Sequence, residues 1–158
     1  MARRLRPEEI GFVGTAPVRL VFAREVSAPP DRVFRALAED VPGWAAWFPA
    51  VTSARAVDGG AGREVRLRGG TRFRETVLVA QAPEVYAYRV DVTDAPGVRA
   101  LVEEWRLAPS GEGTRVQWTF AADGTAAFRG VLRLARTGMG RTFRDAVTRL
   151  DRRLTTPS

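Results

Sequence analysis

This chain of 158 residues contains no cysteine, no histidine and no lysine. Without cysteine there can be no disulfide, thiolate nucleophile or thiolate metal ligand. Without histidine, Ser-His-Asp and Cys-His hydrolases are excluded, and a zinc site would need carboxylates alone. Acid–base chemistry is left to Asp, Glu, Tyr, Arg or a bound water, and we expect neither a metal nor a cofactor.

Long apolar segments are missing as well. No run of apolar residues approaches the ~20 that span a bilayer, so we expect no integral membrane segment. The basic start, residues 1–9, has no apolar core behind it and differs from a secretory signal. The sequence therefore predicts a cytoplasmic protein.

The positive charge comes from one residue type. The net charge is +7, and all 25 basic residues are arginine. Arginine without lysine, among many Ala, Gly, Pro and Val residues, is typical of codon bias in a GC-rich genome. The arginines are interspersed with Asp and Glu, and the aromatic residues fall on inward faces, where they cannot stack on bases. We therefore expect no nucleic-acid partner.

Hydrophobic residues make up 45% of the chain and charged residues 27%, which is typical of one globular domain. Residues 1–17 show no sustained period and form an N-terminal arm, with Ile10 and Phe12 as the side chains that could rest on the domain. Residues 18–154 are the domain itself. Residues 155–158 are a C-terminal tail.

Period-two patterns bounded by Gly and Pro predict a series of strands. We expect strands at 18–27, 50–57, 63–68, 71–82, 85–94, 98–109 and 114–123. Two short helices, at 31–40 and 40–49, follow the first strand, and an amphipathic helix covers 125–154. Gly138 and Gly140 lie in this helix and should mark a bend or a close approach. One helix covers a sheet best if the sheet curls around it, which leaves a cavity of roughly a few hundred Å³.

Three motifs carry a family resemblance. They are Val26-Ser27-Ala28-Pro29-Pro30 before Val33-Phe34, the W-x-x-W-F-P of residues 44–49, and Trp105-Arg106-Leu107-x-Pro109 before Gly113-Thr114-Arg115-Val116. Over residues 18–154 the chain resembles the START-like, helix-grip (SRPBCC) superfamily, and most of all its polyketide cyclase/dehydrase and lipid-transport branch. The resemblance implies an α+β fold in which a curved antiparallel sheet of six to seven strands wraps around a long C-terminal helix. That family includes cyclases, dehydratases and ligand carriers without a universal catalytic motif, so the catalytic residues stay unknown.

Alternation along the strands assigns candidate cavity residues. The inward-facing and helix residues that we expect to contact a ligand are Arg24, Phe73, Glu75, Tyr86, Tyr88, Glu103, Trp105, Trp118, Met139 and Phe143. The aromatic members, Met139 and the nearby Trp44, Trp47 and Phe48 could equally be ordinary core packing.

Arg24, Glu75 and Glu103 are charged residues on otherwise apolar faces. They could anchor a ligand, act as acid–base groups, form a structural ion pair or sit at the rim. Because an unpaired buried ion is costly, we predict that Arg24 reaches Glu103 or Glu75, or else water at the rim.

Three functions fit these patterns. The first is binding of a small lipophilic molecule, such as a lipid or polyketide, in the cavity. The second is a cofactor-independent cyclase or dehydratase that uses Glu, Tyr and Arg groups of the cavity. The third is an interaction module whose contiguous arginine patch meets an acidic partner. We favour the first. The sequence does not define an oligomeric state.

Overall fold

A single antiparallel sheet organises the chain, and the computed structural model describes it over residues 1–156. The strands are β1 (Arg3–Arg4), β2 (Val18–Val26), β3 (Val51–Val57), β4 (Gly62–Leu67), β5 (Arg72–Gln81), β6 (Val85–Thr93), β7 (Val98–Ser110) and β8 (Gly113–Gly124). The helices are α1 (Phe12–Thr15), α2 (Pro30–Ala38), α3 (Trp44–Trp47), α4 (Ala126–Leu134) and α5 (Arg136–Thr155), with a 3₁₀ turn at Asp58–Gly60.

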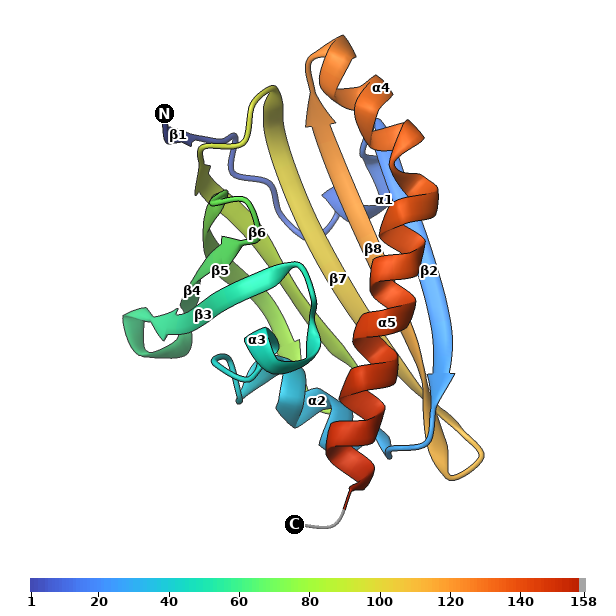
Figure 1. Cartoon of the computed structure of the whole chain (residues 1–158). Helices are drawn as coiled ribbons and strands as arrows, with labels where there is room; N and C mark the ends of the chain where they lie inside the picture. The colour runs from blue at the N-terminus through green and yellow to red at the C-terminus, as the bar shows by residue number, and fades with distance from the viewer. Residues whose placement is uncertain (157–158) are drawn as a thin grey trace.

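Seven of these strands follow the order β2-β8-β7-β6-β5-β4-β3, and β1 pairs with β6 off this path. Tight turns join consecutive strands from β3 to β8, which makes them antiparallel neighbours. Between β4 and β5, Gly69 and Gly70 adopt φ of +93° and +95°, a region open to glycine. The sheet curves toward the C-terminal helix (Figure 1), and the predicted α+β helix-grip architecture is confirmed.

The two short helices predicted after the first long strand are present as α2 and α3. Pro30 begins α2, where its fixed φ suits the first turn and its missing N–H costs nothing. Val33, Phe34 and Leu37 are buried from the same helix. Trp44 then ties α3 to α2, because its Nε1 donates to the Leu37 carbonyl oxygen at 2.9 Å. These helices close one end of the sheet face that α5 also covers (Figure 1).

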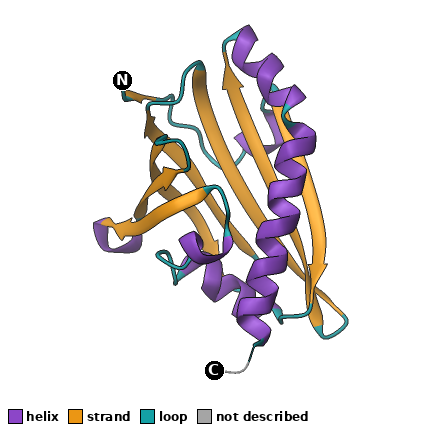
Figure 2. Cartoon of the chain, in the orientation of Figure 1, coloured by secondary structure: helices purple, strands orange, loops and turns teal. Residues whose placement is uncertain are grey.

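The C-terminal segment forms two helices rather than the one predicted over 125–154. The break is at Ala135, whose ψ is −5° and whose N–H is shared between the carbonyl oxygens of Val131, at 2.9 Å, and Leu132, at 3.2 Å. This tightened turn redirects the axis without a proline. Figure 2 shows α4 and α5 along the same face of the sheet, which we call the inner face.

The two mid-helix glycines differ in their surroundings. A Cβ at Gly140 would lie 3.3 Å from the Phe22 ring, so this position is a close approach between α5 and β2. A Cβ at Gly138 would meet nothing within 4 Å. The expectation of a close approach therefore holds for Gly140 alone, and the bend lies three residues before Gly138.

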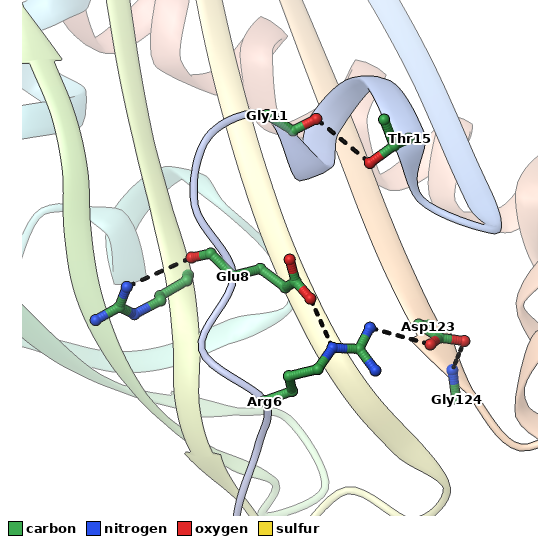
Figure 3. Close-up of polar contacts among 7 residues, drawn as sticks. Arg6, Glu8, Gly11, Thr15, Asp123 and Gly124 are labelled. Carbon is green, nitrogen blue, oxygen red and sulfur yellow. Dashed lines mark hydrogen bonds and ion pairs between the residues drawn. The ribbon is translucent and has the colours of Figure 1, made fainter.

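The N-terminal arm packs on the domain in two places. The Leu5 amide donates to the Asp91 carbonyl oxygen at 2.8 Å as β1 joins β6. Helix α1 then buries Phe12 against the outer face, opposite α5. Between them, Arg6 bonds to Glu8 at 2.6 Å and Asp123 at 3.1 Å (Figure 3).

Of the two arm residues that we expected to rest on the domain, Phe12 does so, but Ile10 is exposed. Ile10 lies in the turn that leads into α1. Over residues 1–156, no helix has both the length and the hydropathy needed to cross a membrane.

Candidate functional site

A cavity of about 210 Å³ lies between the inner face of the sheet, α3 and α5. Trp44, Phe48, Trp118 and Phe120 form an aromatic part of its wall. Phe73 of β5, aliphatic side chains from β3 and β4, and Met139 of α5 extend the apolar part, and Thr142 of α5 borders it. Four polar side chains gather at one side, which we call the polar pole: Arg63, Glu75, Tyr88 and Glu103.

Arg63 and Glu75 form a buried ion pair in the polar pole. They are direct cross-strand partners on β4 and β5, so their side chains leave the sheet on the same face. Arg63 Nε and Nη2 each lie 2.7 Å from Glu75 Oε1, and each residue is 3% exposed. The guanidinium carbon also lies 4.1 Å from the centroid of the Tyr88 ring and 4.6 Å from that of Trp44. With the Tyr86 ring centroid at 5.7 Å, the cation is thus held by one carboxylate and three aromatic rings.

Glu103 is bound by neutral donors instead. Its Oε1 accepts from Trp118 Nε1 at 2.9 Å and from the Tyr88 hydroxyl at 3.1 Å. The Tyr88 oxygen in turn accepts from Trp105 Nε1 at 3.2 Å. These residues come from β6, β7 and β8, where Tyr88 pairs with Glu103 and Trp105 with Trp118 across the strands. The network therefore fixes Glu103 in one orientation.

The polar pole changes the acidity of its members. Burial and the negative charge of Glu75 raise the pKa of Glu103 to about 7, against the opposing charge of Arg63. Burial also raises the pKa of Glu75, and the adjacent guanidinium opposes this rise. For Tyr88, burial and the charge of Glu103 raise the pKa well above its ordinary value, so the hydroxyl stays protonated.

Of these two carboxyl groups, Glu103 is the one that holds a proton near neutral pH. Glu75 pairs with a cation, whose Nε donates to it, whereas Glu103 accepts from an indole and a phenol. A cation stabilises a carboxylate more than neutral donors do.

The described residues contain no cluster of three or more carboxylates that could hold a metal ion.

The structure brings six of the ten predicted site residues to the cavity wall: Phe73, Glu75, Tyr88, Glu103, Trp118 and Met139. The other three aromatic residues are buried beside it without lining it: Tyr86, Trp105 and Phe143. Trp105 stacks on Trp118 with ring centroids 5.5 Å apart, and Trp118 stacks on Phe143 at 5.9 Å. These three side chains pack behind the residues that line the cavity.

Arg24 does not line the cavity, which corrects its place among the candidates. Its side chain is exposed, which is the solvated outcome of the two that we allowed. It lies on β2, the last strand of the sheet, so even a side chain that leaves toward the inner face reaches water past the sheet edge. The partner of Glu75 is Arg63.

Arg63 is the main residue that the sequence reasoning missed. A period-two pattern in the sequence could have identified it. Along β4 the alternating residues are Arg63, Val65 and Leu67, which repeat the pattern of Phe73, Glu75 and Val77 along β5. Thr142 was also missed. It lies one helical turn from Met139 on α5, and both line the cavity.

A second hollow, of about 480 Å³, is bordered by exposed arginines. Because Val65 lines the inner cavity, its neighbours Glu64 and Arg66 point to the outer face. The arginines are Arg55, Arg66, Arg72 and Arg74. Two of them, Arg55 and Arg74, pair with Glu64. This cluster is more contiguous than the scattered charge that the sequence suggested, although part of it is already neutralised.

Solved structures share this fold. The protein XoxI from Bacillus cereus has a TM-score of 0.70 at 16% identity, covering 87% of this chain and 95% of that one. A START superfamily protein from Mycobacterium smegmatis has a TM-score of 0.70 at 12% identity, covering 86% and 96%. DynU16, a protein of the dynemicin biosynthetic locus, has a TM-score of 0.61 at 22% identity, covering 87% of this chain and 47% of that chain.

The curved sheet, the C-terminal helix and the cavity between them define a START-like helix-grip protein. The model of one family, described as polyketide cyclase / dehydrase and lipid transport, matches residues 17–155, and the chain belongs to that family. A search of curated proteins finds no match.

Proposed function

We propose that this protein binds a small lipophilic molecule, a lipid, polyketide or similar compound, in the cavity between the sheet and α5. The observation that carries the proposal is a cavity of about 210 Å³ with an aromatic wall and one polar pole. A mostly apolar wall with a few polar groups is typical of small-molecule sites.

The wall indicates the size and shape of the ligand. The volume of the cavity is below the range of about 300–1,000 Å³ that is usual for pockets that bind drug-sized ligands. The rings of Trp44, Phe48 and Trp118 line it, and the Trp44 and Phe48 rings stack with centroids 5.8 Å apart. A compact molecule with one polar end fits this wall better than a long acyl chain.

Two measurements test the proposal. Native mass spectrometry of the protein purified from its host should show a bound small molecule, which organic extraction then releases for identification. The variant Thr142→Phe, which places a ring in the cavity, should weaken binding by about tenfold or more. Thr148→Phe is the matched control, because Thr148 is also half-buried on α5 but does not line the cavity. Equal binding by both variants would contradict the proposal.

The second candidate function is a cofactor-independent cyclase or dehydratase. The observation that favours it is Glu103, whose pKa of about 7 suits a general acid or base at neutral pH. The Tyr88 hydroxyl lies 3.1 Å away and could orient a substrate oxygen. The two functions differ by turnover. Conversion of an extracted ligand by the wild type, and its loss in Glu103→Gln, would favour the enzyme.

A further inference from the structure

The two oxygens of Glu103 have different environments. Oε1 accepts both hydrogen bonds, from Trp118 and Tyr88, while Oε2 has no hydrogen-bond partner among residues 1–156. Oε2 is also not among the side-chain atoms that the protein encloses completely without a partner, which are Trp47 Nε1 and Arg63 Nη1. Since Glu103 lines the cavity, Oε2 is the oxygen that the carboxyl group presents to it.

This arrangement also fixes where the carboxyl proton lies. An oxygen that accepts two hydrogen bonds acts as the carbonyl oxygen of a carboxylic acid, so the O–H of protonated Glu103 is at Oε2. Protonated Glu103 therefore offers a donor to the cavity. Ionised Glu103 offers only an acceptor at the same point. Loss of the proton thus turns one atom of the polar pole, Oε2 of Glu103, from a hydrogen-bond donor into an acceptor.

We propose that Glu103 is the specificity-determining residue of the cavity: its protonated Oε2 donates to the carbonyl oxygen of a neutral lipophilic ligand, and its ionised form accepts only from a ligand hydroxyl. The inference rests on the proposed binding function. The ligand class of the protonated state is a small ketone, quinone or ester. A ligand hydroxyl both donates and accepts, so it fits either state of Glu103.

The charges around Glu103 favour a neutral ligand. Arg63 from β4 and Glu75 from β5 cancel each other in their ion pair. Tyr88 from β6 stays protonated, and α5 and α3 contribute only the non-ionisable Met139, Thr142 and Trp44 to the cavity. An anionic ligand would have to displace Glu75 from Arg63 or leave a net buried negative charge, and both are costly. Glu103 is thus the group of the cavity wall whose charge changes near neutral pH.

Three probes with one ring skeleton test the inference: 1-tetralone carries a carbonyl group, 1-tetralol a hydroxyl group, and tetralin neither. Their affinities are measured at pH 5.5 and pH 8.5 by calorimetry or by quenching of tryptophan fluorescence. For a pKa of about 7, the protonated fraction of Glu103 falls by roughly 30-fold between these pH values. The ratio of tetralone affinity to tetralol affinity should therefore fall by up to about 30-fold.

The wild-type titration can overturn the inference without any variant, and Glu103→Gln shows whether Glu103 is the group that titrates. Glu103→Gln should remove the pH dependence of the ratio, because the amide donates at every pH. Glu104→Gln is the control, since Glu104 is also buried but pairs with Arg106. A ratio that does not change with pH in the wild type, or that still changes in Glu103→Gln, overturns the inference while leaving the binding function intact. If none of the probes binds, tetralin included, the binding function itself is contradicted.

Discussion

Arg63 directs both Nε and Nη2 to a single oxygen of Glu75, at 2.7 Å each, inside a wall made mostly of aromatic and aliphatic side chains. The pair leaves Arg63 Nη1 without a hydrogen-bond partner among the described residues. The two buried charges therefore depend mainly on each other, and the rings of Tyr88, Trp44 and Tyr86 give the cation its remaining support. This dependence sets how the polar pole responds to mutation.

The first prediction concerns this ion pair. Arg63→Met should lower the free energy of unfolding by about 3–5 kcal/mol, because it leaves Glu75 buried without its partner. Adding Glu75→Gln should restore part of that loss, since the double variant holds no stranded charge. Urea unfolding of the single and double variants measures both effects. Arg24→Met is the control and should change stability by less than about 0.5 kcal/mol, because Arg24 is exposed.

The second prediction concerns pH and Glu103. Its pKa is about 7 in the folded protein and about 4.3 in an unfolded chain, so the folded state binds the extra proton between these values. The stability that this proton contributes is complete below about pH 4 and is lost as the pH rises through 7. Between pH 5 and pH 8.5 the wild type should lose of the order of 2–3 kcal/mol relative to Glu103→Gln. Parallel stability curves for the two proteins would show that Glu103 does not titrate in this range.

Alternation along strands predicted which way most site residues point, and it did so for a physical reason. Successive side chains of a regular strand leave on opposite faces, so Phe73, Glu75 and Val77 share one face of β5. The same rule, applied to β4, would have placed Arg63 beside Glu75. The ion pair of the polar pole was therefore within reach of the sequence.

The sequence did not show how deep an inward side chain lies or which strand forms the edge of the sheet. Tyr86 and Trp105 face inward as predicted, but whether an inward side chain lines a cavity or packs behind it depends on the elements that cover it. Arg24 faces water because β2 is the last strand, and strand order is a property of the whole sheet. The break at Ala135 likewise has no proline or glycine at the site to signal it.

The third prediction compares the two helix glycines. Gly138→Ala should raise stability by up to about 1 kcal/mol, because alanine favours the helix and its Cβ meets open space. Gly140→Ala should gain less or lose stability, since its Cβ would lie 3.3 Å from the Phe22 ring. Thermal unfolding of the two variants measures the difference. An equal gain at both positions would mean that Phe22 moves aside without cost.

The last prediction concerns the N-terminal arm. Phe12 is buried against Val102 and Ala121 on the outer face, while Ile10, two residues earlier, is exposed. Phe12→Ala should therefore cost about 3–5 kcal/mol, the usual range for a buried phenylalanine. Ile10→Ala should change stability by less than about 0.5 kcal/mol.

Because Phe12 packs on the face opposite the cavity, Phe12→Ala should leave the affinity for tetralone unchanged at temperatures where the variant is folded. Chemical unfolding and calorimetry at pH 5.5 check the two expectations separately. A large loss of ligand affinity in Phe12→Ala would show that the arm controls the shape of the inner face, and that the two faces of the sheet do not act independently.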